Sequence, residues 1–150
     1  MDTDIDIIIL CEGHDRKLHE FFIRNKEDYT LFHPHGYSIT ELGDILTQKK
    51  RDIYSAIFGN GDIIAYGILR GWDEGYSIPS LGIMIDKEYR QVGLFSLYMK
   101  YLHTICKIRN CDKVRLSVLK KNTKAVALYR GLGYNLVELN STELVGTKTL

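Results

Sequence analysis

The chain has 150 residues, and its 20 Lys and Arg nearly balance its 19 Asp and Glu, which gives a formal net charge of +1. This length is typical of one domain that buries a core without disulfides or metals, and a content of 45% hydrophobic and 26% charged residues is ordinary for a globular protein. So small a net charge argues against a polyanion-binding protein, and we expect neither a nucleic acid nor a membrane surface as a partner.

The hydrophobic pattern predicts a mixed α/β domain over residues 1–150, with elements in the order β-α-α-β-β-β-α-β-α-β. A run of isoleucines predicts the first strand over Ile5–Leu10, and apolar residues at helical spacing predict a helix over His14–Asn25. Thr40 is a suitable N-cap for a second helix that continues to about Lys50. No internal repeat or Pro/Ser-rich linker divides the chain.

A central antiparallel hairpin is the clearest local prediction. Residues 52–58 and 63–69 alternate in strand fashion, and the Asn60-Gly61 pair between them strongly favours a hairpin turn. A further strand is expected over Ile78–Asp86. The remaining predicted elements are a long amphipathic helix over 92–109, a strand over Val114–Val118, a helix from Asn122 to Arg130, and a closing strand over Tyr134–Leu139. A further strand over Leu144–Thr149 is left open.

The near-zero total charge hides a gradient along the chain. Residues 1–75 carry a net charge of −6, and residues 76–150 carry +7. Such a division is compatible with a site that meets an anion on one side, and equally with solvated charge that is unevenly distributed.

The cysteines and the first residues of the chain bear on the cellular location that we expect. Cys11, Cys106 and Cys111 are odd in number and form no CxxC pair, so neither a disulfide framework nor a zinc site is indicated. Reduced thiols are the rule in cytoplasmic proteins. The acidic start lacks the basic region of a signal peptide, and no apolar run approaches the ~20 residues that cross a bilayer. We therefore expect a cytoplasmic protein.

The junction between strand Ile78–Asp86 and the next helix carries features of an anion site. A helix N-terminus offers unpaired N–H groups and the positive end of the helix dipole, where a phosphate fits if no side chain covers the backbone. Gly93 leaves the first turn uncovered, and Arg90 adds a positive charge. A glycine near a helix start is also common as a structural turn, so the junction alone does not decide the function.

A second cluster follows a strand about 30 residues later, and the two clusters together resemble the GNAT acetyltransferase family. The acetyl-CoA loop of that family has the pattern Arg/Gln-x-x-Gly-x-Gly/Ala, whose defined places are occupied here by Arg90, Gly93 and Phe95. Its later motif, Asn-x-x-Ala-x-x-Leu-Tyr followed by Gly-Tyr/Phe, is matched by Asn122, Ala125, Leu128, Tyr129, Gly133 and Tyr134. The predicted element order also resembles the GNAT fold across nearly the whole chain.

The resemblance implies an enzyme in which a primary amine attacks the acetyl-CoA thioester directly, beside a splayed strand. The N–H groups of residues 92–95 would hold the pyrophosphate, and the backbone of Met84 and Ile85 would bond the pantetheine and polarise the carbonyl. The implied cofactor-binding residues are Met84, Ile85, Arg90, Gln91, Val92, Gly93, Leu94, Phe95 and Asn122. Phe95 departs from the family pattern, which puts the closeness of the loop to the pyrophosphate in question.

The catalytic assignments follow the same resemblance. Tyr129 would donate a proton to the departing thiolate, and its plain alternative is a core tyrosine on an amphipathic helix. Removal of a proton from the acceptor ammonium needs a base or a water chain. For that base we expect Glu74 first and His35 second, because both lie in loops that the GNAT fold places near the acceptor.

The acceptor residues come from the same two loops, each of which contains one of the two prolines together with aromatic and titratable groups. The predicted substrate-binding residues are His33, Trp72, Asp73, Tyr76 and Ser80. Each has an ordinary alternative: a surface histidine, a buried tryptophan anchor or a turn carboxylate. His33 and His35 lack further ligands at metal spacing, so we expect no metal.

These patterns predict an acetyl-CoA-dependent N-acetyltransferase that acts on a small-molecule amine, for which an amino sugar, nucleotide-linked ones included, suits the acceptor loops. The alternatives are a protein or peptide N-acetyltransferase and a non-catalytic acyl-CoA-binding regulatory module. The basic half of the chain holds both CoA motifs, and the acidic half supplies the loops expected to meet a cationic amine. A homodimer is left open.

Overall fold

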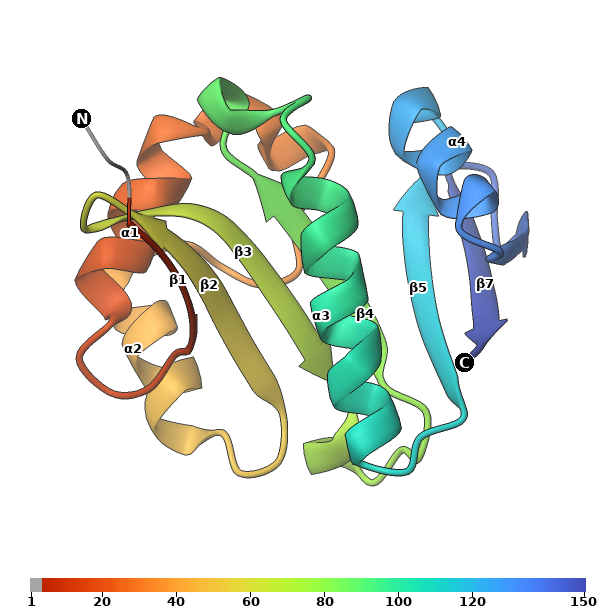
Figure 1. Ribbon diagram of the computed structural model, residues 1–150, viewed down its shortest axis with the longest axis horizontal. Coiled ribbons are helices and arrows are strands. Elements are labelled where there is room, and N and C mark those ends of the chain that lie inside the picture. Colours follow the sequence, from red (N-terminus) through yellow and green to blue (C-terminus); the bar gives the residue numbers. More distant parts are fainter. Residues whose placement is uncertain (1–3) are drawn as a thin grey trace.

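Seven strands form one mixed sheet in the order β1-β2-β3-β4-β5-β7-β6 (Figure 1). The computed structural model describes residues 4–150. The strands are β1 (Ile5–Ile9), β2 (Ile53–Gly59), β3 (Asp62–Arg70), β4 (Ser80–Ile85), β5 (Lys113–Leu119), β6 (Asn135–Glu138) and β7 (Glu143–Thr149). The α-helices are α1 (Asp15–Arg24), α2 (Ile39–Gln48), α3 (Leu94–Ile108) and α4 (Thr123–Gly131).

The mixed α/β fold and the predicted order of elements are confirmed, including the hairpin of β2 and β3. The N-cap prediction at Thr40 is wrong: Ser38 caps α2, because its extended backbone lets its side chain accept the N–H of Glu41 (3.1 Å). The Asn122 cap of α4 is confirmed by the bond from the N–H of Ala125 (3.4 Å). Within residues 4–150, no helix has the length and apolar content to cross a membrane.

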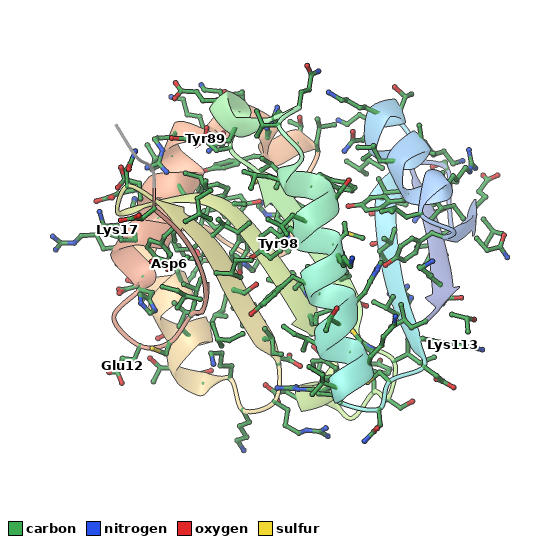
Figure 2. The ribbon with its side chains drawn as sticks, in the orientation of Figure 1. Asp6, Glu12, Lys17, Tyr89, Tyr98 and Lys113 are labelled. Carbon is green, nitrogen blue, oxygen red and sulfur yellow. The ribbon has the colours of Figure 1, made fainter. Side chains whose placement is uncertain are left out.

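Two apolar cores lie on opposite faces of the sheet. Side chains of α1 and α2, such as Leu18 and Leu42, pack on one face, and side chains of α3 and α4 pack on the other. Tyr98 projects from α3 onto the sheet (Figure 2), where its hydroxyl bonds Ser55 Oγ (2.7 Å). A Cβ at Gly67 would lie 2.7 Å from the Tyr98 ring, so glycine is what lets α3 approach the central strands.

The sheet is open between β4 and β5. β3 and β4 pair along their whole length, from Ala65–Ile85 to Arg70–Ser80, and β5 and β7 also pair throughout. In contrast, β4 and β5 run parallel and pair only at Ser80 and Arg115, after which the two strands diverge (Figure 1). The divergence leaves one edge of β4 without a neighbouring strand, which confirms the predicted splayed strand.

A buried contact beside this region predicts a pH dependence of stability. His103 Nε2 lies 2.7 Å from the Tyr134 hydroxyl, and burial, with the nearby charges of Lys148 and Lys107, lowers the pKa of His103 to about 4. Because the unfolded chain binds this proton more readily, the stabilisation is complete above about pH 6.5 and is lost as pH falls toward 4. Burial lowers the pKa of His35 as well and acts in the same direction.

Urea unfolding at pH 7 and at pH 4.5 checks this dependence. The free energy of unfolding should fall between the two pH values by a larger amount in the wild type than in His103→Gln, which cannot titrate. An equal fall in both proteins would show that His103 does not contribute.

Candidate functional site

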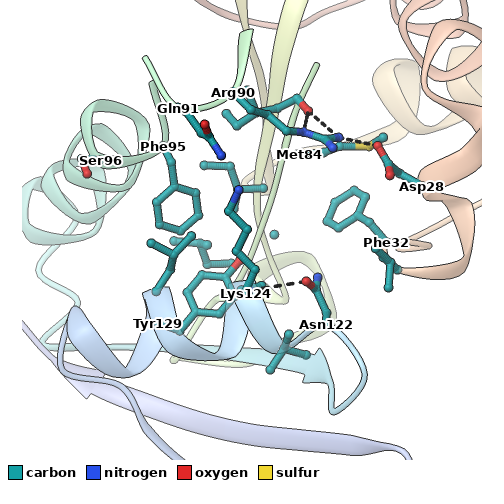
Figure 3. Close-up of a pocket in the computed structure, with 18 of the residues that line it drawn as sticks. Asp28, Phe32, Met84, Arg90, Gln91, Phe95, Ser96, Asn122, Lys124 and Tyr129 are labelled. Atoms are coloured by element: carbon teal, nitrogen blue, oxygen red, sulfur yellow. Dashed lines mark hydrogen bonds and ion pairs between the residues drawn. The ribbon is translucent and has the colours of Figure 1, made fainter. Parts of the chain in front are cut away.

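A cavity of about 600 Å³ lies where β4 and β5 diverge (Figure 3). One wall is β4 from Leu81 to Ile85, and the facing wall is formed by α4 and the end of β5. The first turn of α3 and the loop before it close one end, and the segment that contains Phe32 closes the other side. The opening of the sheet, rather than a surface loop, therefore creates the site.

The open edge of β4 presents unpaired backbone groups to this cavity. Hydrogen-bonded pairs alternate along an antiparallel ladder, and the N–H of Asp86 donates to Ile64 O (2.9 Å). The backbone groups of Leu81, Ile83 and Ile85 therefore point away from β3. Leu81 lies beside Arg115, where β4 and β5 still pair, and the carbonyl of Ile85 accepts from Arg90. The groups left free toward the cavity are those of Ile83 and the N–H of Ile85. Those of Met84 point toward β3, so Met84 contributes its side chain, whereas Ile83 offers the amide groups that we predicted for Met84.

The α3 N-terminus provides a second set of free N–H groups. Gly93, the N-cap residue of α3, has a left-handed backbone (φ 91°, ψ 0°), and no side chain caps the helix. A Cβ at Gly93 would meet no protein atom within 4 Å, so the backbone lies open to the cavity that it lines. The first-turn N–H groups have no intrahelical acceptor and can bind an anion.

Arg90 lies beside this turn and is held by two partners. Its guanidinium donates to Ile85 O (3.1 Å) and forms an ion pair with Asp28 (Figure 3). Asp28 belongs to a short 3-10 helix, Lys26–Thr30, which is fixed to the same loop because Asn25 bonds Asp86 (3.1 Å) and the N–H of Lys87 (3.0 Å). These contacts hold the wall that contains Phe32 in place across from α4.

Tyr129 projects from α4 into the cavity, opposite β4 (Figure 3). Its ring packs against the rings of Phe95 (5.7 Å between centroids) and Tyr134 (5.8 Å). Burial raises the pKa of Tyr129, so the hydroxyl keeps its proton at neutral pH. Every enclosed side-chain oxygen and nitrogen of residues 4–150 has a hydrogen-bond partner, and no described residue bonds this hydroxyl, which therefore remains open to the cavity. Phe95, the departure from the family pattern, lies against Tyr129 and orients it.

A second cavity of about 240 Å³ adjoins the first. Leu31, Phe32, Leu81, Gly82, Ser117 and Val118 line both cavities, so the two meet between β4 and β5. The polar side chains of the second cavity include His33, Arg70, Ser80 and Glu143. His33 and Ser80 were predicted as substrate-binding residues, and the structure brings both to this cavity.

The loop after β3 does not reach either cavity. Trp72 is buried in the core beneath the Arg109 guanidinium, which lies 4.5 Å from the ring centroid, at the C-terminal end of α3. Asp73 accepts the N–H groups of Lys50 (2.9 Å) and Arg51 (2.6 Å), and these bonds lower its pKa. The exposed side chains of Glu74 and Tyr76 lie in the same loop, outside the residues that line the cavities.

His35 is also held away from the cavities. Its Nδ1 lies 2.8 Å from Gly36 O and therefore carries the proton, and its Nε2 accepts from the hydroxyl of the fully buried Tyr66 (2.8 Å). Burial lowers the pKa of His35, which stays neutral in this aromatic cluster on the α1 and α2 face. Both ring nitrogens of His35 are engaged, so the geometry does not support His35 as the base. Glu74 lies outside both cavities, so the geometry does not support Glu74 either.

The remaining predicted residues divide between side-chain and backbone contributions. Seven of the predicted cofactor-binding residues line the first cavity: Met84, Ile85, Arg90, Gln91, Gly93, Phe95 and Asn122. Val92 is exposed and Leu94 is buried in the core below α3, so these two offer only backbone groups. No group of three or more potential metal ligands occurs in the described part of the chain.

Sequence reasoning missed several lining residues. Lys124 lies inside the second motif and could have been found from its charge. Asp28, Ser117 and Glu143 carry no local signal, because each reaches a cavity only through the packing of the sheet and the 3-10 helix.

The chain is similar to known proteins in sequence and in structure. The sequence model of the acetyltransferase (GNAT) family matches residues 18–134. No curated protein sequence matches the chain.

Solved structures share the fold along nearly the whole chain. An acetyltransferase of the GNAT family from Streptococcus pneumoniae superposes with a TM-score of 0.79 at 19% identity, covering 98% of this chain and 100% of that one. PaiA N-acetyltransferase from Thermoplasma acidophilum, in complex with coenzyme A, gives 0.81 at 15% identity, covering 98% and 99%. The ribosomal-protein-S18-alanine N-acetyltransferase from Escherichia coli gives 0.76 at 18% identity, covering 97% and 94%.

Proposed function

The chain belongs to the acetyltransferase (GNAT) family and is an N-acetyltransferase, and we propose that it transfers the acetyl group of acetyl-CoA to the primary amine of a small molecule. The observation that carries this proposal is the divergence of β4 and β5 after Ser80 and Arg115. This divergence joins a large cavity at the α3 N-terminus to a smaller polar cavity, so that two substrates can meet within the sheet.

Acetyl-CoA is assigned to the larger cavity. The N–H groups at the start of α3, uncovered at Gly93, suit the pyrophosphate. Lys124 adds positive charge to this cavity, and Arg90, whose charge Asp28 balances, adds hydrogen-bond donors. The unpaired backbone groups of Ile83 and the N–H of Ile85 suit the amides of pantetheine, which would extend along β4 as an added strand does. The coenzyme A in the structure of PaiA, a protein of the same fold, supports this assignment.

The acceptor amine is assigned to the smaller cavity. Its nitrogen attacks the carbonyl carbon at the junction of the two cavities, the C–N bond forms, and the C–S bond breaks. The proton that the leaving thiolate gains comes from the Tyr129 hydroxyl, which is protonated at neutral pH and open to the cavity. The nitrogen loses one proton as the amide forms, and this proton returns to Tyr129 through water.

The ammonium form of the acceptor must lose a proton before attack. For an amine of pKa ~10.4, this costs about 4–5 kcal/mol at pH 7, and an amine acidified by neighbouring hydroxyls costs less. His33 and Glu143 line the smaller cavity and can receive the proton directly or through water. Glu143 replaces Glu74 as the carboxylate that the geometry favours.

Release of free thiol from acetyl-CoA tests the proposed function. We would assay amino sugars, amino acids, polyamines and a peptide with an N-terminal alanine, and identify the acetylated product by mass spectrometry. We expect turnover with a small amine. Turnover with the peptide alone would contradict the small-molecule assignment and favour a protein substrate, such as the one named for the Escherichia coli structure. Neither thiol release nor thermal stabilisation by acetyl-CoA would contradict the proposal as a whole.

A further inference from the structure

The smaller cavity carries positive charge at one end. Arg70 of β3 pairs in register with Ser80 of β4, and Ser80 pairs with Arg115 of β5, so these three residues form one row across the sheet. Cross-strand partners lie on the same face of a sheet, and the bond from Arg115 Nη1 to Ser80 Oγ (3.2 Å) agrees with this. Arg70 and Arg115 thus lie on either side of Ser80, about 10 Å apart at the backbone.

Neither guanidinium is neutralised by the protein. Arg70 donates to Pro34 O (2.7 Å) and is half-buried, and no carboxylate of residues 4–150 lies within 4.0 Å of Arg70 or Arg115. Arg90 in the larger cavity differs, because Asp28 balances its charge. A partly desolvated arginine without an acidic partner favours an anionic ligand, which its planar donors bind in a bidentate manner.

The other end of the cavity carries an unneutralised carboxylate. Glu143 begins β7 and pairs with Leu119, which lies four residues beyond Arg115 on β5, or about 13 Å along the strand. Its Oε2 accepts from Asn140 Nδ2 (3.3 Å), and no described cationic group lies within 4.0 Å of it. Gly82 and Ser117, where the two cavities meet, lie between the two charged ends.

We infer that the acceptor is an amine that also carries an anionic group, a phosphate or a carboxylate. The anion binds at Arg70 and Ser80 with Arg115 beside them, and the ammonium faces Glu143, which places the nitrogen near the junction of the cavities. This inference rests on the proposed function, because it names the class of acceptor for the same site. It excludes simple polyamines, whose second charge is positive and would face the arginines.

Matched pairs of amines test the inference. The first pair is glucosamine 6-phosphate with glucosamine, and the second is β-alanine with β-alaninamide, so that the two pairs separate a phosphate from a carboxylate source. We expect the anionic member of at least one pair to be preferred by about 10- to 100-fold in kcat/KM, the size of one charge-assisted hydrogen bond. The same preference should appear, without turnover, in thermal stabilisation of the protein saturated with coenzyme A.

Three variants assign the preference to the row of residues. In Arg70→Gln the preference should fall to about twofold or less, because kcat/KM should fall far more for the anionic amine than for the neutral one. Arg115→Gln, which leaves the contact with Pro34 in place, should lower the preference in the same direction. Arg130→Gln removes an exposed charge of α4 outside both cavities and should change nothing.

Other outcomes overturn the inference. Three results would each refute it and leave acetyl-CoA binding intact. They are equal or better use of the neutral members, a preference that survives both substitutions, and no stabilisation of the coenzyme-saturated protein by either anionic amine. Failure of acetyl-CoA to stabilise the protein would instead refute the proposed function.

Discussion

Replacing Tyr129 with phenylalanine is expected to lower kcat by about 10²- to 10³-fold, the range of a lost general acid. The hydroxyl projects into the larger cavity and its pKa is raised by burial, so it is a proton donor at neutral pH. Phenylalanine keeps the ring and its contacts with Phe95 and Tyr134, so the Kd of acetyl-CoA should change by about twofold at most. Steady-state kinetics and calorimetric titration measure the two quantities.

Tyr101→Phe is the matched control for this prediction. Tyr101 is a half-buried tyrosine of α3 that lies outside both cavities, so loss of its hydroxyl should leave kcat unchanged. A kcat of Tyr129→Phe within threefold of the wild type would remove the acid role, and Tyr129 would then be a core tyrosine.

Replacing Gly93 with alanine is expected to weaken acetyl-CoA binding by about 10- to 100-fold, the loss of one charge-assisted hydrogen bond from the start of α3. The added Cβ would enter open space beside the free N–H groups, where the pyrophosphate is proposed to bind. The left-handed backbone adds a stability cost of about 1–2 kcal/mol, because L-residues avoid φ near 90°. Each kcal/mol corresponds to about 2–4 °C in Tm.

Gly75→Ala separates these two effects. Gly75 has nearly the same backbone conformation (φ 92°, ψ 4°), an added Cβ would again meet nothing within 4 Å, and the residue lies outside both cavities. Both variants should lose a similar amount of thermal stability, and only Gly93→Ala should lose affinity. Equal affinity in the two variants would place the pyrophosphate elsewhere.

Local patterns were sufficient to predict the elements and many of the residues that line the larger cavity. The hairpin, the α3 junction and the Asn122 cap each depend on residues that are close in sequence, so their chemistry is visible without the fold. The Thr40 prediction failed by two residues because Ser38, also a good cap, has the extended backbone that a cap requires.

The acceptor side depends on contacts between distant strands, and sequence reasoning could not supply them. The loop after β3 is rich in aromatic and acidic residues, but Trp72 buries its large apolar surface in the core and Asp73 caps backbone N–H groups. Arg115 and Glu143 are brought to the acceptor side by the order β4-β5-β7, which no local pattern encodes.

The charge gradient also takes a different form in three dimensions. The basic half does hold the cofactor motifs, and the larger cavity includes Arg90 and Lys124. The smaller cavity reverses the expectation, since its arginine, Arg70, comes from the acidic half and its carboxylate, Glu143, comes from the basic half. Local net charge therefore agrees with the charged residues of the larger cavity and not with those of the smaller one.

Amide hydrogen exchange, with and without saturating acetyl-CoA, tests the central claim most directly. If acetyl-CoA binds in the opening between β4 and β5, it should protect the amides of Ile83 and Ile85 and those at the start of α3, and should leave β1 and β6 unchanged. Protection confined to other elements, with the open edge of β4 still exchanging at its free rate, would contradict the account.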